Sequence, residues 1–257
     1  MNTENTEDIS AEVLSKVPEV TLVFWIIKIL ATTLGETGGD AVSMSMNLGY
    51  LVGTAIFAVI FMLAVTAQIT AKKFHPAMYW LTIIATTTVG TTLADFADRS
   101  LGIGYAGGTT ILFCLLLASL FTWHRALGSI AVDTVSTPKS EMFYWITIMF
   151  SQTLGTALGD WTADTAGLGY SGGAIIFGAM LAIIAAAYFW TKISRTALFW
   201  AAFILTRPLG AVIGDLLDKP IISGGFAFSR YTASAILFVA IASCIFIFPH
   251  KPAIRAH

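Results

Sequence analysis

The chain has 257 residues and a formal net charge of −1; 56% of its residues are hydrophobic, 11% are charged, and the mean hydropathy is +0.80. A soluble domain of this length does not reach such values, so the composition excludes a soluble protein and predicts an integral membrane protein. The lipid bilayer is therefore an expected partner, and nothing in the charge balance points to nucleic acid.

The N-terminal segment, residues 1–18, is acidic and lacks both a basic start and an apolar run, so it does not have the pattern of a signal peptide. We expect a short, solvated cytoplasmic tail there and a second cytoplasmic tail at residues 250–257. The region between them, residues 19–249, is expected to form the transmembrane domain.

Eight apolar runs follow in order, each about 20 residues long and therefore long enough to cross a bilayer as a helix. They fall near residues 19–40, 50–70, 77–97, 106–124, 141–162, 171–191, 196–217 and 231–249. The predicted fold class is all-α: a polytopic membrane protein with eight transmembrane helices.

A stretch of twenty-six residues, from Trp145 to Tyr170, occurs four times in the chain. The other copies begin at Trp25, Trp80 and Trp200, and in every copy a glycine follows the tryptophan by ten residues and an aspartate by fifteen. Gly-Tyr completes the first three copies, whereas the fourth has Gly224 and Gly225 in those places. The matches predict four tandem repeats of two helices each, with boundaries at 19–75, 76–137, 138–193 and 194–249.

The lysines and arginines indicate the orientation. Because each repeat crosses the membrane twice, all four repeats enter from the same side and run parallel. The side that holds both termini carries Lys16, Lys72, Lys73, Arg125, Lys139, Lys192, Arg195, Lys251 and Arg255, and the other side carries Arg99, Lys219 and Arg230. This asymmetry predicts cytoplasmic termini, and the repeat tryptophans are interpreted as anchors at the cytoplasmic interface.

Small residues form a stripe along the odd-numbered helices, at positions six, ten and fourteen after each tryptophan. The stripe consists of Ala31, Gly35, Gly39; Thr86, Gly90, Ala94; Ser151, Gly155, Gly159; and Thr206, Gly210, Gly214. A spacing of four places these residues on one helix face, where small side chains let helices approach closely within lipid. We therefore expect the odd-numbered helices to pack together inside and the even-numbered helices to lie outside.

A polar stripe runs beside the small one, at positions seven, eleven and fifteen. It consists of Thr32, Glu36, Asp40; Thr87, Thr91, Asp95; Gln152, Thr156, Asp160; and Arg207, Ala211, Asp215. Each repeat also carries a pair of acidic residues three or four positions apart: Glu36 with Asp40, Asp95 with Asp98, Asp160 with Asp164, and Asp215 with Asp218. The two stripes predict that carboxylates face a shared interior.

Like charges about 4 Å apart repel by roughly 4 kcal/mol at an effective dielectric constant of 20, so something must neutralise these carboxylates. A hard divalent cation could bind them, and the expected metal ligands are Glu36, Asp40, Asp95, Asp160 and Asp215. Protons could neutralise them instead. Internal ion pairs with Lys28 and Arg207 are the third alternative, and Thr32, Thr91, Gln152 and Thr156 would support any of these networks.

The acidic residues differ in their expected depth. Fifteen helical residues span about 22 Å, so the aspartates at that position are expected near the outer boundary of the hydrocarbon. For Asp98, Asp164 and Asp218, ending a helix or capping a turn is the favoured interpretation, although all three remain candidate cation or proton sites. Glu36 lies one turn deeper and occurs in the first repeat alone, which makes it the leading functional candidate.

Four tandem two-helix repeats, each with a tryptophan, a Gly/Asp motif and Gly-Tyr, resemble a family of bacterial inner-membrane proteins. The family is built of a tandem repeat of unknown function, and its members are labelled membrane-anchored proteins. The resemblance covers residues from about 20 to 249 and implies an eight-helix protein of the bacterial inner membrane. The fourth repeat departs from the pattern because no tyrosine follows Gly224.

The function expected from the residues is secondary transport of a divalent metal cation, with Mn²⁺ favoured and with proton-coupled export. The absence of a nucleotide-binding motif indicates that ion gradients would drive transport. We expect no enzyme activity and no cofactor, since the companion motifs of an intramembrane aspartyl protease are missing. The alternative is a membrane scaffold or sensor whose acidic residues are structural, and a homo-oligomer remains open.

Overall fold

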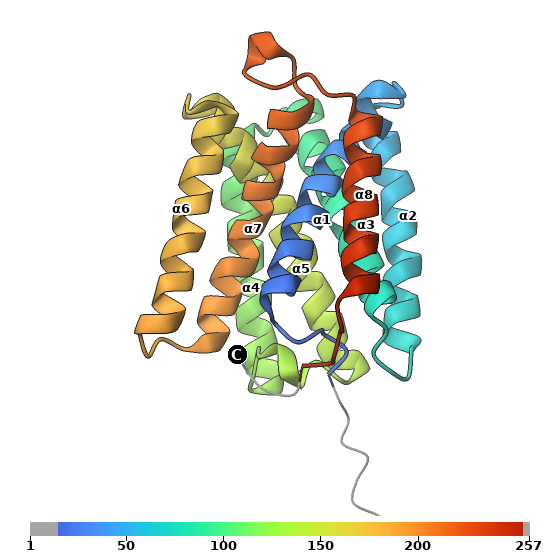
Figure 1. Ribbon diagram of the computed structural model, residues 1–257, viewed down its shortest axis with the longest axis vertical. Coiled ribbons are helices and arrows are strands. Elements are labelled where there is room, and N and C mark those ends of the chain that lie inside the picture. The colour runs from blue at the N-terminus through green and yellow to red at the C-terminus, as the bar shows by residue number, and fades with distance from the viewer. Residues whose placement is uncertain (1–14, 254–257) are drawn as a thin grey trace, which may run out of the picture.

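The computed structural model describes residues 15–253, so residues 1–14 of the predicted N-terminal tail and residues 254–257 lie outside the described part. Eight long helices and no strand occur within residues 15–253 (Figure 1). They are α1 (Leu22–Asp40), α2 (Gly49–Thr70), α3 (Pro76–Asp95), α4 (Tyr105–Leu127), α5 (Pro138–Asp160), α6 (Gly169–Trp190), α7 (Arg195–Asp218) and α8 (Arg230–Ile247). The predicted all-α class with eight long helices is confirmed.

Short helical turns join or extend these helices. α1, α3 and α5 each continue into a π-helical turn, and two 3₁₀ turns lie in the connections. The π turns are η1 (Ala41–Ser45), η2 (Phe96–Ser100) and η4 (Trp161–Thr165), and the 3₁₀ turns are η3 (Val132–Thr134) and η5 (Ile221–Ser223). α5 begins earlier than predicted because Thr137 and Ser140 form a capping box, in which each side chain accepts a hydrogen bond from the other's backbone N–H.

Six helices in the described part of the chain are long and apolar enough to cross a membrane: α1 together with η1, α2, α4, α6, α7 and α8. α3 and α5 carry more polar side chains. α3, for example, holds buried threonines at Thr86, Thr87, Thr88, Thr91 and Thr92. These threonines are compatible with a central position, because neighbouring helices rather than lipid surround them.

The odd-numbered helices form a closed inner ring. α1 packs against α3, α3 against α5, α5 against α7, and α7 returns to α1. The even-numbered helices lie outside this ring, and each packs on the odd-numbered helix of the next repeat: α2 on α3, α4 on α5, α6 on α7, and α8 on α1. The predicted division into inner and outer helices therefore holds, and contact between the last helix and the first closes the circle (Figure 1).

Glycines at position ten of each repeat set the spacing of the ring. A Cβ atom built on Gly35 would overlap Thr87, and one on Gly210 would overlap Thr32. A Cβ on Gly90 would lie 3.0 Å from the backbone of Gln152. In each case the neighbour is position seven of the next repeat, so the small stripe of one helix receives the polar stripe of the following helix. The predicted close packing of the small faces is confirmed.

Replacing Gly155 by alanine is expected to lower the free energy of unfolding by about 1–3 kcal/mol, because the added methyl group overpacks the ring. Its Cβ would overlap Arg207 and lie 3.0 Å from the ring carbon of Pro208, which cannot rotate away. The matched control is Gly178→Ala on α6, where no atom lies within 4 Å of the new Cβ. Thermal unfolding in detergent should separate the two variants; equal stability would contradict the predicted packing.

The two ends of the described chain meet below the ring, at what we call the termini end; the opposite end, where the repeat aspartates lie, is the aspartate end. Lys16 forms a 2.6 Å ion pair with Glu141 of α5, and the backbone N–H of Ala253 donates to Val17 at 2.8 Å. Residues 15 to 18 are buried. The prediction of a solvated tail is therefore wrong for these residues, because they close the termini end by pairing with the C-terminal segment.

The repeat tryptophans do not form an interfacial belt. Trp80, Trp145 and Trp200 are buried, and Trp25 is partly buried. Trp200 donates its indole N–H to the carbonyl of Ile130 at 2.9 Å. The interpretation as lipid-interface anchors is wrong because these rings pack between inner helices, where they form part of the main hydrophobic core.

Candidate functional site

The inner faces of the four ring helices form five stacked layers. Every fourth residue of a helix lies on the same face, so positions −1, 3, 7, 11 and 15 relative to each tryptophan follow one another along the ring axis. From the termini end, the layers are Phe24, Tyr79, Tyr144, Phe199; Lys28, Ile83, Ile148, Phe203; Thr32, Thr87, Gln152, Arg207; Glu36, Thr91, Thr156, Ala211; and Asp40, Asp95, Asp160, Asp215. All twenty residues are buried. The ring is thus apolar at the termini end and becomes polar toward the aspartate end.

The first layer closes the termini end with aromatic rings. The hydroxyl groups of Tyr79 and Tyr144 form a 2.6 Å hydrogen bond between the adjacent helices α3 and α5. The ring of Phe24 lies 6.5 Å from that of Tyr79 and 6.2 Å from that of Phe199. These side chains fill the end of the axis.

The fifth layer is held together by two cations that each bridge two aspartates. Arg99 lies 3.1 Å from Asp95 and 3.0 Å from Asp160. Lys219 lies 2.8 Å from Asp40 and 3.0 Å from Asp215. Each cation thus joins the aspartate of its own repeat to the aspartate of the next one.

Both bridging cations occupy the same place in the repeat, nineteen residues after the tryptophan. The first and third repeats have Met44 and Asp164 at this position. The layer therefore has approximate two-fold symmetry on a four-fold scaffold. Burial by itself lowers the pKa of Lys219, but the carboxylates of Asp215 and Asp40 outweigh burial and raise the pKa above its ordinary value. Lys219 stays charged as a result.

Arg207 of α7 belongs to the third layer, but its guanidinium group extends across the axis into the fourth layer. Its Nη2 donates to Glu36 at 2.9 Å and to Thr91 at 2.6 Å, and also to Thr156. The guanidinium group thus reaches position eleven of the other three repeats. The Arg207–Glu36 contact is the internal ion pair that the sequence suggested as one way of neutralising the carboxylates. Lys28 takes no part in it, because its Nζ has no hydrogen-bond partner.

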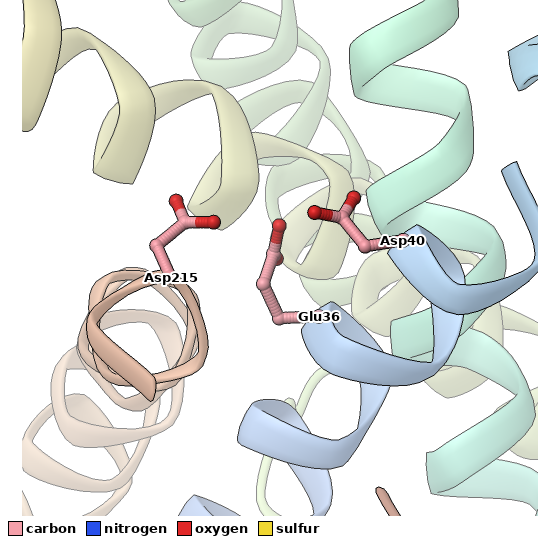
Figure 2. A group of neighbouring side chains, drawn as sticks. All are labelled: Glu36, Asp40 and Asp215. Carbon is pink, nitrogen blue, oxygen red and sulfur yellow. The ribbon is translucent and has the colours of Figure 1, made fainter. Parts of the chain in front are cut away.

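Three carboxylates converge at the junction of the fourth and fifth layers. Glu36 and Asp40 on α1 and Asp215 on α7 each place an oxygen within 4.8 Å of the others (Figure 2). We call these residues the carboxylate cluster. All three are buried, and their side chains point into one shared space. Carboxylate oxygens at such spacing match the ligand set of a hard divalent cation.

The other predicted cation ligands do not join this cluster. Asp95 and Asp160 belong to the fifth layer, as Asp40 and Asp215 do, but they lie on the opposite side of the ring, where both pair with Arg99. Asp218 pairs with Arg230 at 2.8 Å, Asp98 is buried with neither oxygen bonded, and Asp164 is exposed. None of these last three side chains makes a helix-capping hydrogen bond in residues 15–253, but Asp218 is the last residue of α7, as the helix-ending interpretation predicts.

Sequence reasoning missed three cations at the aspartate end: Arg99, Lys219 and Arg230 served only to indicate orientation. The shared position of Arg99 and Lys219 in alternate repeats was a signal that could have revealed them. Even with these cations, the acidic pairs of the four repeats outnumber the basic residues inside the ring and at the aspartate end. The eight carboxylates of the pairs compare with five cations, Lys28, Arg99, Arg207, Lys219 and Arg230, so three negative charges remain in excess when all groups are ionised.

A scan against protein families finds a repeat described as Repeat of Unknown Function (DUF347) at residues 23–74, 78–128, 143–194 and 198–248. No curated protein and no solved structure matches the chain. The four matches cover most of the chain and coincide with the four helix pairs of the ring. The chain therefore belongs to the DUF347 family.

Proposed function

We propose that this protein is a secondary transporter of a divalent metal cation, with Mn²⁺ as the first candidate and with proton-coupled export. The observation that carries the proposal is the carboxylate cluster: three buried acidic side chains from two inner helices, within 4.8 Å of one another. Carboxylates in the membrane interior are costly, and their common role there is to bind ions or protons along a pathway.

All eight helices cross the membrane in this proposal, including α3 and α5. These two helices have 20 and 23 residues, and about 20 residues suffice to span the hydrocarbon. Neighbouring helices cover them, so they do not need apolar surfaces of their own. The lysines and arginines at the termini end favour a cytoplasmic location for that end, in the inner membrane of a bacterium. The outer helices then face lipid or a second copy of the chain.

In the ion-free state, Arg207 and Lys219 neutralise the carboxylates that would bind the metal ion. Both contact the carboxylate cluster, at 2.9 Å from Glu36 and 2.8 Å from Asp40. A divalent ion carries the charge of both side chains in a single atom, and it can approach three carboxylates together. Its binding displaces the two side chains from their oxygens. This exchange avoids leaving the carboxylates without a positive partner at any stage.

The two ends of the axis differ in the way that alternating access needs. At the termini end, the aromatic layer and the bond between Tyr79 and Tyr144 block the route. At the aspartate end, the side chains of the two bridging cations, Lys219 and Arg99, retain 12% and 29% exposure, so the fifth layer reaches solvent. Export requires the aromatic layer to open toward the cytoplasm and the bridging cations to move aside.

Proteoliposomes containing the purified protein test the proposal. With an opposing pH gradient, we expect uptake of Mn²⁺ above that of empty vesicles and acceleration when the gradient is steepened. Parallel assays with Zn²⁺, Co²⁺, Ni²⁺ and Cu²⁺ measure selectivity. Failure to move any of these ions would favour the alternative, a scaffold or sensor in which the ion pairs serve only to hold the ring together.

A further inference from the structure

The second layer of the ring holds one ionisable side chain, Lys28, among apolar neighbours. Lys28 is fully buried at 0% exposure, and the other members of its layer are Ile83, Ile148 and Phe203. Its Nζ lies 4.2 Å from the centre of the Phe203 ring and has no hydrogen-bond partner. A buried ammonium group without a counter-ion is costly, and the aromatic ring offsets only part of that cost.

Few charged groups lie near Lys28. A change in the charge of any one of them therefore strongly affects whether Lys28 is protonated. Arg207 on α7 is the nearest cation, and Glu36 on its own helix is occupied by Arg207. The other titratable side chains facing this core are the hydroxyls of Tyr79 on α3 and Tyr144 on α5, and the thiol of Cys244 on α8. None of these groups supplies a negative charge to Lys28 in the ion-free structure.

We propose that Lys28 carries the proton that is exchanged for the metal ion. This inference rests on the proposed transport function and names the group that couples it to protons. The third layer, between Lys28 and the carboxylate cluster, holds buried oxygens of Gln152 and Thr87 that have no partner and do not bond to Lys28 in the ion-free structure. In this proposal Lys28 holds the proton in the ion-free state, in which Glu36 neutralises Arg207.

In this proposal, metal binding makes a protonated Lys28 less favourable, because it separates Arg207 from Glu36. When the ion binds Glu36, the guanidinium group loses its carboxylate and leaves an unpaired positive charge in the fourth layer, two layers or about 12 Å of helix from the layer of Lys28. Repulsion between the two cations in a low-dielectric interior then disfavours the charged lysine. An N–H bond of Lys28 breaks, its electron pair stays on Nζ, and the proton passes to solvent. One proton leaves Lys28 for each ion bound.

Calorimetric titration of the purified protein with Mn²⁺, in buffers of different ionisation enthalpy, measures the protons released per ion. We expect Lys28→Met to bind Mn²⁺ and to release about one proton fewer than the wild type. The affinity of the wild type should rise with pH more steeply than that of Lys28→Met. Lys28→Arg keeps its charge at any accessible pH, so it should also release fewer protons and should bind Mn²⁺ more weakly than Lys28→Met.

The control is Lys72→Met, because Lys72 is exposed in the link between α2 and α3 and should leave proton release unchanged. Thermal unfolding establishes that each variant is folded. If the wild type does not bind Mn²⁺, both the transport proposal and this inference fall. If it binds and Lys28→Met releases as many protons as the wild type, only the role of Lys28 is overturned. Binding that requires chloride, with unchanged proton release, would instead identify an anion as the partner of Lys28 and would overturn it too.

Discussion

Replacing Glu36 by glutamine is expected to lower the initial rate of Mn²⁺ transport by roughly 10- to 100-fold, the effect of losing one charged contact to the ion. Glu36 is the deepest member of the carboxylate cluster and the only acidic residue in its layer. The amide has nearly the same shape and can still accept a hydrogen bond from Arg207, but the buried guanidinium loses its counter-ion, so we expect the variant to be less stable than the wild type. Uptake into proteoliposomes, compared at equal amounts of folded protein, measures the effect.

The matched control for this variant is Asp164→Asn. Asp164 belongs to the same set of repeat acids and removes the same charge, but it is exposed and lies outside the carboxylate cluster. We expect its transport rate to equal that of the wild type. Equal rates for Glu36→Gln and the wild type would instead show that the cluster does not bind the transported ion.

Replacing Arg207 by methionine is expected to lower the free energy of unfolding by about 3–5 kcal/mol, because it leaves Glu36 as a buried carboxylate without a counter-ion. The hydroxyls of Thr91 and Thr156 also lose their common donor. Unfolding of the detergent-solubilised protein, followed by heat or denaturant, measures the loss. Arg125→Met serves as the control, since Arg125 is exposed at the end of α4.

A double variant separates the ion pair from the packing of Arg207. Glu36→Gln combined with Arg207→Met removes both charges, so no buried carboxylate remains, and we expect it to regain a large part of the stability lost in Arg207→Met. Breaking one partner of a buried pair costs more than removing both. If the double variant were less stable than Arg207→Met alone, the cost would lie in lost packing rather than in the unpaired charge.

The sequence by itself determined the repeat, the helices and the composition of each face. The four tryptophans set a common register, so spacings of ten and fifteen residues placed the glycines and aspartates at equivalent points of four helices. Side chains four residues apart share a helix face, and this local geometry sufficed to predict small stripes that pack and polar stripes that turn inward. Helix-forming periodicity and apolar length are local properties, which is why they could be read without knowing which helices are neighbours.

The tertiary structure alone decided which charges meet. Arg207 and Glu36 are separated by 171 positions in the sequence, and Lys219 and Asp40 by 179. Their contacts exist because α7 returns to α1 and α8 packs behind it, which no local pattern specifies. Ring closure also decided that Asp40 and Asp215 join Glu36 while Asp95 and Asp160 turn to Arg99. The energy of each ion pair depends on a distance across the ring, and only the packing of the four inner helices sets that distance.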